Sequence, residues 1–238
     1  MSNRLPILFL PGDTYANRMP DPVLQQVEHF NNPGITANDA FKPVTKYFDR
    51  ILRPEQILQS LPQAIQTMLD PADCGPVCIS LSQDVQGEAY EYPEEFFKEK
   101  IHNIRRPRAD DYQIKEAAEK IKKSKNPIII SGGGVFYSDA MEELSNFATK
   151  HNIPVTQTVM GYSTMKRDHS HFLGPIGGLG GKAANNFAKK TDLAIAVGTK
   201  LGDFTTGSWA NFENPNFGLV SVNITRFDAN KHMAQSVI

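Results

Sequence analysis

The chain has 238 residues, of which 40% are apolar and 21% are charged, a composition typical of a globular protein. Its 25 basic and 26 acidic side chains give a formal charge of −1, so no basic field attracts the phosphates of a nucleic acid. The longest apolar runs, such as Ile128-Ile129-Ile130, are too short to cross a bilayer, and the first residues lack the apolar core of a secretion signal. We therefore expect a cytoplasmic protein with neither nucleic acid nor membrane as a partner.

The first part of the chain combines strand and helix patterns. Residues Leu5–Leu10 form a nearly all-apolar run ended by Pro11-Gly12, which predicts a strand buried on both faces of a parallel sheet. Residues 11–38 are rich in Pro, Asn and Asp, which predicts a loop. Apolar side chains at helical spacing follow Arg53, and Gly75–Leu81 is predicted to be a second buried strand. A strand, a helix and a strand in this order predict a right-handed parallel crossover unit.

A charged segment separates the two halves of the chain. Residues 87–111 contain acidic and then basic side chains with few aliphatic positions, as is typical of a solvated linker. We therefore divide the chain into a first α/β domain over residues 1–95, a linker over 96–111 and a second domain over 112–238.

Helices and strands alternate again in the second half. The helices are predicted over 112–124, 140–151 and 182–189, and the strands over 127–130, 154–158, 193–198 and 219–224. This alternation predicts an α/β fold in which helices flank a parallel sheet, here a Rossmann-like, doubly wound domain. No further helix and strand are predicted after residue 224, so we expect this domain to be incomplete at its C-terminus.

Loops rich in small residues follow the predicted strands of the second domain. Because the carboxyl ends of parallel strands meet at one edge, where ligands of open α/β sheets bind, these loops are predicted to line a crevice. The candidate cofactor-binding residues are Gly132, Gly133, Gly134, Gly178, Gly180, Gly181 and Asp203.

Two phosphate-binding templates fit the glycine-rich segment after Gly174 poorly. A P-loop requires Gly, four residues and then Gly-Lys-Ser/Thr, but Ile176 occupies the first glycine position and Ala183 the hydroxyl position. Residues 178–183 match G-x-G-x-x-G/A, yet a long loop rather than the first strand precedes them. The glycines therefore either line a nucleotide crevice or permit turns with positive φ and close approach to a neighbouring strand, and both interpretations remain open.

The sequence pattern identifies no catalytic residue and no metal site. Cys74 and Cys78 have no partnering ligands and are predicted to be ordinary thiols. Asp168-His169-Ser170-His171 contains two histidines without a nearby cysteine or carboxylate cluster. No serine lies in a G-x-S-x-G elbow.

Several ordered segments nevertheless resemble those of a known family. In the first half they are Asp39-Ala40-Phe41, Gly75-Pro76-Val77 and Leu81–Gln86, and in the second half Asn126–Gly134, Gly174–Asn185 and Asp192–Gly198. They resemble, in order, the closing half of the pyrimidine-binding domain and the central domain of thiamine-diphosphate enzymes of the acetohydroxyacid synthase group. The resemblance extends over nearly the whole chain.

Three further segments, Arg53–Gln56, Gln83–Tyr90 and Gly202–Ser208, are similar to the inositol-catabolism branch of this family. That branch opens a cyclic diketone by hydrolytic C–C cleavage. The resemblance implies thiamine diphosphate and Mg²⁺ as cofactors, a small cyclic diketone as substrate, and a homo-oligomer, either a dimer or a tetramer. It also places Phe41 beside the substrate. FAD, which the central domain of some relatives carries, is not expected for a reaction without a redox step.

The resemblance further implies that the catalytic groups belong to other parts of the enzyme. The glutamate that activates the cofactor precedes the matching segments, and the G-D-G…N motif that holds Mg²⁺ and the diphosphate belongs to a third domain. The chain is thus similar to an internal piece of the enzyme and is expected to be inactive by itself. An acetohydroxyacid synthase-like lyase or transferase and a stand-alone nucleotide-binding module are the alternatives.

Overall fold

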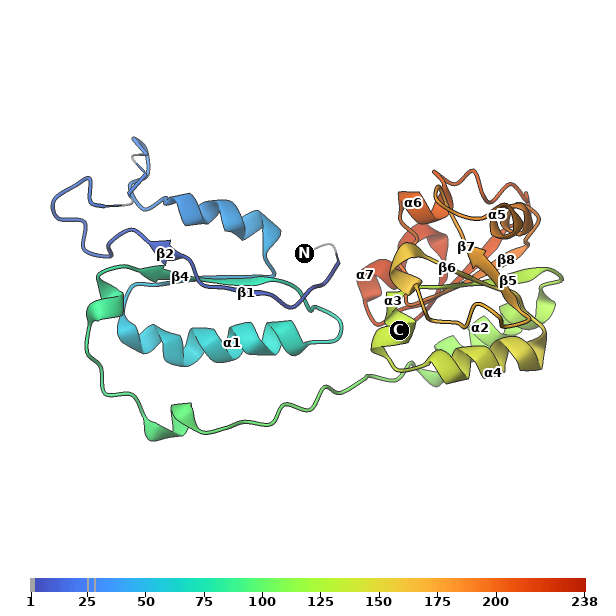
Figure 1. The fold of residues 1–238 in the computed structure, drawn as a ribbon, viewed down its shortest axis with the longest axis horizontal. Coiled ribbons are helices and arrows are strands. Elements are labelled where there is room, and N and C mark those ends of the chain that lie inside the picture. The colour runs from blue at the N-terminus through green and yellow to red at the C-terminus, as the bar shows by residue number, and fades with distance from the viewer. Residues whose placement is uncertain (1–2, 25, 28) are drawn as a thin grey trace. The chain divides into compact units, whose positions relative to one another are not determined.

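The computed structural model describes residues 3–24, 26–27 and 29–238. The chain divides into two compact units, Met1–Arg105 and Arg106–Ile238, each built around its own sheet (Figure 1). The paired strands of the described residues all run parallel to their neighbours. The predicted α/β fold, with parallel sheets and flanking helices, is therefore confirmed.

The sheet of the first unit is centred on β4 (Val77–Ser82), whose residues are nearly all buried. Strand β3 (Tyr47–Ile51) pairs with one side of β4, and β1 (Leu8–Phe9) and β2 (Gly12–Asp13) pair one after the other with the opposite side. Pro11 separates β1 from β2 because it has no N–H to donate, although its carbonyl still accepts a hydrogen bond from the Leu81 N–H at 2.9 Å.

The two faces of this first sheet differ in character. Helix α1 (Ile57–Leu69) packs on an apolar face, where Ala64 contacts a buried cluster that includes Val77 and Ile79. The other face carries Ser80, whose hydroxyl bonds to Asn38 of η1, an eight-residue 3₁₀ helix over Ala37–Val44. Figure 1 shows α1 and the η1 segment on opposite sides of the sheet.

The expectation that Leu5–Leu10 is buried on both faces is wrong. Leu8 and Phe9 are 37% and 40% exposed, and the flanking apolar residues are more exposed still. The reason is position: β1 pairs only with β4 among the described strands, so it forms an edge of the sheet. An apolar run alone does not distinguish a central strand from an edge strand.

The second unit contains a six-stranded parallel sheet with the order β10-β9-β8-β5-β6-β7. This is the strand order of a doubly wound sheet, in which the two halves diverge from a switch point, here between β5 and β8. The strands are β5 (Pro127–Ser131), β6 (Val155–Gln157), β7 (Phe172–Pro175), β8 (Leu193–Val197), β9 (Gly218–Val222) and β10 (Gln235–Val237).

Helices cover both faces of this sheet. Alternate side chains of β5 divide between two cores: Ile129 packs with residues of α2 (Asp111–Lys123) and α4 (Met141–His151), whereas Ile128 packs with residues of α5 (Lys182–Ala188). The remaining α-helices of the described residues are short: α3 (Gly133–Tyr137), α6 (Asp203–Thr206) and α7 (Arg226–Ala229). The remaining 3₁₀ turns are η2 (Pro54–Gln56), η3 (Val85–Gly87), η4 (Glu94–Phe97), η5 (Val159–Gly161) and η6 (Lys231–Met233).

Strands β7 and β10 occupy the two edges of the sheet, and the sequence pattern predicts neither. Strand β7 contains Gly174 and Pro175, which are depleted in strand interiors but tolerated at sheet edges, and β10 has only three residues. The final strand that we expected to be missing is therefore present. Among the described residues, no helix combines the length and the apolar character that crossing a membrane requires.

Candidate functional site

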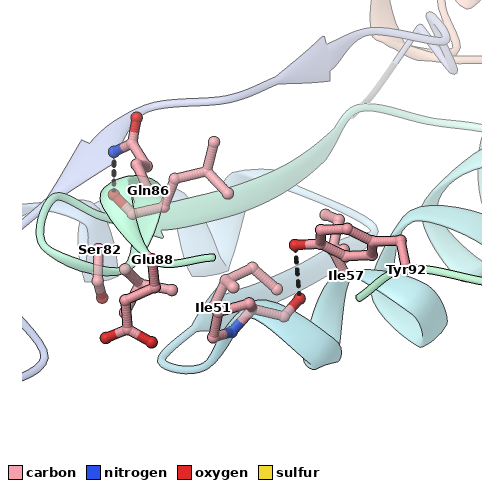
Figure 2. Close-up of a pocket in the computed structure, with 9 residues that line it drawn as sticks. Ile51, Ile57, Ser82, Gln86, Glu88 and Tyr92 are labelled. Carbon is pink, nitrogen blue, oxygen red and sulfur yellow. Dashed lines mark hydrogen bonds between the residues drawn. The ribbon is translucent and has the colours of Figure 1, made fainter. Parts of the chain in front are cut away.

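The carboxyl ends of the strands in each parallel sheet meet at one edge, which is where such sheets bind ligands. In the first unit this edge holds a shallow pocket of about 130 Å³ beside the ends of β3 and β4 (Figure 2). Its lining residues are Ile51, Pro54, Ile57, Leu81, Ser82, Val85, Gln86, Glu88 and Tyr92.

Two polar side chains of this pocket bond to its own wall. The Tyr92 hydroxyl donates to the Pro54 carbonyl at 3.4 Å, and Gln86 Nε2 donates to the Leu81 carbonyl at 3.0 Å (Figure 2). Glu88 is the single carboxylate of the lining, and its side chain is exposed. The lining also contains Ser82, whose buried hydroxyl has no hydrogen-bond partner among the described residues. The lining contains no His, Lys or Arg side chain to act as a base beside these two groups, so it forms no recognisable catalytic arrangement.

A buried group of charged residues lies on the opposite face of the same sheet. Arg50 Nε donates to Asp13 Oδ2 at 2.6 Å, and Arg50 Nη2 donates to Thr36 Oγ1 at 2.9 Å and to Asp39 Oδ2 at 2.8 Å. The Ser80 hydroxyl donates to the same oxygen of Asp13. Asp13 is only 3% exposed. We call Asp13, Thr36, Asp39, Arg50 and Ser80 the Arg50 network; it joins β2, β3 and β4 to the start of η1.

The Arg50 network holds its members in their charged forms. Burial tends to raise the pKa of Asp13, but hydrogen bonds from Ser80 and Arg50 outweigh it and lower this pKa below its ordinary value. Burial tends to raise the pKa of Asp39 too, but hydrogen bonds from Lys42, Thr36 and Arg50 outweigh it and lower this pKa to about 2. The pKa of Arg50 is raised, because its bonds to both carboxylates outweigh burial.

Phe41, which the family resemblance implies lies beside a substrate, is midway along η1 and half-buried. Its ring stands edge-on to the ring of Phe9, with 4.7 Å between centroids and an interplanar angle of 73°. It is not among the residues that line the pocket of Figure 2. The structure therefore places Phe41 over the polar face of the sheet, against the edge strand β1.

In the second unit, the loop after β5 packs directly on the loop after β8. Gly132 N–H donates to the Val197 carbonyl at 2.8 Å, and Gly134 N–H donates to the Gly198 carbonyl at 3.0 Å. A Cβ atom on Gly132 would lie 2.4 Å from the Gly198 oxygen, and one on Gly134 would lie 2.5 Å from the Gly198 Cα. One on Gly133 would lie 3.0 Å from a neighbouring carbonyl oxygen. Close backbone packing therefore accounts for these three glycines.

The glycine-rich loop after β7 packs in the same way on α6. Gly177 has a φ of +105°, and a Cβ there would lie 2.0 Å from the Phe204 carbonyl oxygen. A Cβ on Gly180 would lie 2.6 Å from the Gly177 nitrogen. At Gly178 and Gly181 the nearest atoms would be 3.9 Å away, so these two glycines leave room for a further group. Turn geometry and close approach thus explain most of the loop without a ligand.

Asp203 begins α6 and is exposed, and its Oδ1 accepts a hydrogen bond from the Ser208 hydroxyl at 2.9 Å. The structure thus brings the candidate residues to one edge of the sheet but in two pairs of loops. One pair joins the loops after β5 and β8, and the other joins the loop after β7 to α6.

The sequence analysis did not identify the buried polar residues near these loops. Gln157, at the end of β6, is 7% exposed, and among the described residues its Oε1 has no hydrogen-bond partner. The hydroxyls of Ser131 and Thr164 lie 2.5 Å apart, and Thr164 also donates to the Gly161 carbonyl at 2.7 Å. Single polar residues within or after apolar strands form no motif, so only the structure reveals this group.

The two histidines of the H-x-H pair have hydrogen-bonding neighbours at their ring nitrogens. His171 Nε2 lies 2.9 Å from Asn152 Oδ1, and His169 Nε2 lies 3.4 Å from Thr149 Oγ1. His169 Nδ1 accepts from the His171 backbone N–H at 3.2 Å. Within the part of the chain that the structure describes, no group of three or more His, Cys, Asp or Glu side chains is placed to hold a metal ion.

Comparison with known proteins gives one family and a consistent set of relatives. Residues 114–238 match the central domain of thiamine pyrophosphate enzymes. The chain is 52% identical over 236 residues to a 3D-(3,5/4)-trihydroxycyclohexane-1,2-dione hydrolase of Clostridium perfringens. This alignment covers 99% of the chain and 37% of that relative. A hydrolase of the same name from Clostridium botulinum is 51% identical over 229 residues, and the alignment covers 96% of the chain and 36% of that relative. One from Bacillus cereus is 46% identical over 237 residues, and the alignment covers 100% of the chain and 37% of that relative. The chain thus spans little more than a third of their length.

The glycine packing leads to a first prediction. Gly177→Ala should lower the free energy of unfolding by about 2–4 kcal/mol, because the methyl group meets a backbone carbonyl at a positive φ. Gly178→Ala, in the same loop but with its nearest neighbour at an ordinary contact distance of 3.9 Å, should change it by less than about 1 kcal/mol. Denaturant titration of both variants measures the difference, and equal stabilities would contradict the packing explanation.

The ionisation of Asp39 leads to a second prediction. Because its folded pKa is lowered from 3.8 to about 2, its ionised form stabilises the fold above pH 3.8, and this contribution is lost as the pH falls towards 2. Asp39→Asn should therefore be less stable than the unmodified chain at neutral pH and lose less stability over that acid range. Denaturant titrations from pH 7 to 2 measure both effects. Asp73→Asn, at a side chain that is 73% exposed, is the control and should leave the profile unchanged.

Proposed function

We propose that this chain, which belongs to the thiamine pyrophosphate enzyme family, is part of a hydrolase that opens the ring of trihydroxycyclohexane-1,2-dione. The observation that carries this proposal is the identity of 46–52% to relatives with that name over 96–100% of the chain. The match covers both structural units and not the central domain alone. Its breadth favours this substrate over that of an acetohydroxyacid synthase-like enzyme.

The proposed substrate is a small cyclic diketone, and the product is a ring-opened deoxyglucuronate of myo-inositol degradation. When bound, thiamine diphosphate supplies a nucleophilic carbanion and an electron sink for cleavage of the C–C bond. We further propose Mg²⁺ as the ion that accompanies its diphosphate, a homo-oligomeric assembly, either a dimer or a tetramer, and a cytoplasmic location.

The described residues of this chain do not fit a complete site for that cofactor and its metal ion. Asp13 and Asp39, which approach each other around Arg50, are hydrogen-bonded to that guanidinium. Among the described residues, no group of three or more His, Cys, Asp or Glu side chains is placed to hold a metal ion. We therefore assign no catalytic step to a residue of this chain, in agreement with a chain that spans 37% of its relatives.

The proposed division of labour follows the resemblance. Residues 1–95 form the C-terminal part of a pyrimidine-binding domain, 96–111 a linker and 112–238 a central domain, with Phe41 beside the substrate. The two compact units, which meet at residues 105 and 106, support a boundary in this region. The candidate loops of the central domain keep an architectural role in this proposal, because backbone packing already explains most of their glycines. The same packing weakens the alternative of a stand-alone nucleotide-binding module, and FAD has no support.

The test of the proposed function is turnover of the dione. The full-length protein that contains this chain, supplied with thiamine diphosphate and Mg²⁺, should convert the cyclic dione to the open-chain acid, measured by NMR of the products. The 238-residue chain alone should not, because it spans 37% of the relative and its described residues contain no group of three or more metal-ligating side chains. The control omits thiamine diphosphate and should show no conversion.

Two results would contradict this proposal. Turnover of the dione by the 238-residue chain alone would show that it is not an inactive part of the enzyme. Condensation of pyruvate by the full-length protein, without opening of the dione, would favour the acetohydroxyacid synthase-like alternative.

A further inference from the structure

We propose that Arg50 is a positioning residue, which holds the start of η1 against the sheet and thereby sets the position of Phe41. This inference rests on the proposed function, in which Phe41 lies beside the substrate. It concerns a residue outside the segments that carry the family resemblance, and it depends on the geometry of the Arg50 network.

The η1 segment needs external support to keep its conformation. It is a 3₁₀ helix of eight residues, whereas 3₁₀ runs longer than about four residues are uncommon because their hydrogen-bond geometry is poor. Pro43 lies inside it and contributes no N–H to its hydrogen bonds. The conformation of η1 therefore depends on what anchors it to the sheet.

The N-terminus of η1 carries a capping box that Arg50 holds from outside. Thr36 N–H donates to Asp39 Oδ2 at 2.7 Å, and Asn38 N–H donates to Thr36 Oγ1 at 3.2 Å. Arg50 Nη2 then donates to both side-chain oxygens of this box, at 2.9 Å to Thr36 and 2.8 Å to Asp39. One nitrogen on β3 thus ties the two capping residues to the sheet.

Asp13 fixes the direction of the Arg50 guanidinium. Its Oδ2 accepts from Arg50 Nε at 2.6 Å and is also held by the buried Ser80 hydroxyl. Lysine could not replace this arrangement, because its ammonium is a single point of charge and cannot reach Asp13 and the capping box with separate nitrogens. Lys42 bonds to Asp39 Oδ1 at 2.5 Å, whereas Oδ2 accepts from Arg50 and from the Thr36 N–H.

Phe41 follows the capping box within one turn. The contacts of Arg50 with Thr36 and Asp39 therefore control the position of its ring. The Phe41 carbonyl accepts a hydrogen bond from the Thr45 hydroxyl at 2.9 Å, and its ring contacts the exposed edge strand through Phe9. Neither contact ties the first turn of η1 to the buried strands. Among the described contacts, three residues make that connection: Arg50, Thr36 and Asn38. The Thr36 side chain hydrogen-bonds to Asp13 of β2. Asn38 donates to the Gly12 carbonyl and to Ser80 Oγ, each at 2.8 Å.

The experiment compares Arg50→Lys with Arg53→Lys in the full-length protein. Arg53 is the matched control, because its side chain is 76% exposed and pairs only at the surface with Glu55 at 2.9 Å. Two readouts are needed: amide hydrogen exchange over residues 36–45, and the separate KM and kcat for the dione. Thermal unfolding confirms that each variant is folded.

We expect Arg50→Lys to speed exchange in η1 by about tenfold, because local opening no longer breaks the bonds to the capping box. It should raise KM by about tenfold with a smaller change in kcat, because a displaced Phe41 mainly weakens binding of the substrate. Arg53→Lys should match the unmodified protein in exchange, KM and kcat. If Arg50→Lys does not fold, the double variant Asp13→Asn with Arg50→Gln is tested in its place. In that variant Asp13 does not remain as a buried carboxylate without its arginine partner.

Two outcomes would overturn the inference. Unchanged exchange over residues 36–45 in a folded Arg50 variant would show that Arg50 does not hold η1. Faster exchange with unchanged KM would show that holding η1 does not position a substrate-binding group. Failure of the unmodified full-length protein to open the dione would refute the proposed function and with it the role of Phe41. Hydrogen exchange needs no substrate, so it still tests separately whether Arg50 holds η1.

Discussion

Parallel pairing is the constraint on which both units depend. A parallel strand cannot be joined to its neighbour by a tight hairpin, so each connection crosses over a face of the sheet, commonly as a helix. Central strands are then covered on both sides and become almost entirely apolar, as in Pro127–Ser131 and Leu193–Val197. The same constraint gathers the carboxyl ends of the strands at one edge in each unit. Every candidate residue of the second unit lies near that edge for this reason.

This constraint also explains how much of the fold could be predicted. The central strands β4, β5 and β8 follow from short apolar runs, because burial on two faces leaves a strong signal in the sequence. The edge strands do not: β7 and β10 are short or contain Gly and Pro, and the Leu5–Leu10 run is half exposed although it is apolar. The number of neighbours that a strand has is a property of the tertiary fold, and local composition records it poorly.

The sequence predicted where the candidate loops lie, but not why they contain glycine. The glycine loops do lie at the carboxyl edge of the second sheet, yet letters alone could not decide between a ligand and close packing. Atomic distances show close packing at Gly132 and Gly177, where a Cβ would collide with a backbone oxygen. The Arg50 network could not be predicted, because its contacts join residues far apart in sequence, such as Asp13 and Arg50. The two charged residues within the strand Tyr47–Ile51, Asp49 and Arg50, were the local sign of it.

The Arg50 network is better explained as a device of geometry than of stability. Buried ions lose hydration, and replacing a buried ion pair by apolar residues of similar volume is often neutral or stabilising. An apolar cluster at this place would hold η1 against the sheet without defining its register, since apolar contacts have no direction. The guanidinium instead requires its nitrogens to meet Asp13 on one side and the Thr36–Asp39 cap on the other, so one orientation of η1 satisfies them together. The proposed role of η1, which presents Phe41 to a substrate, needs that directional constraint, whereas a segment that only covers a sheet does not.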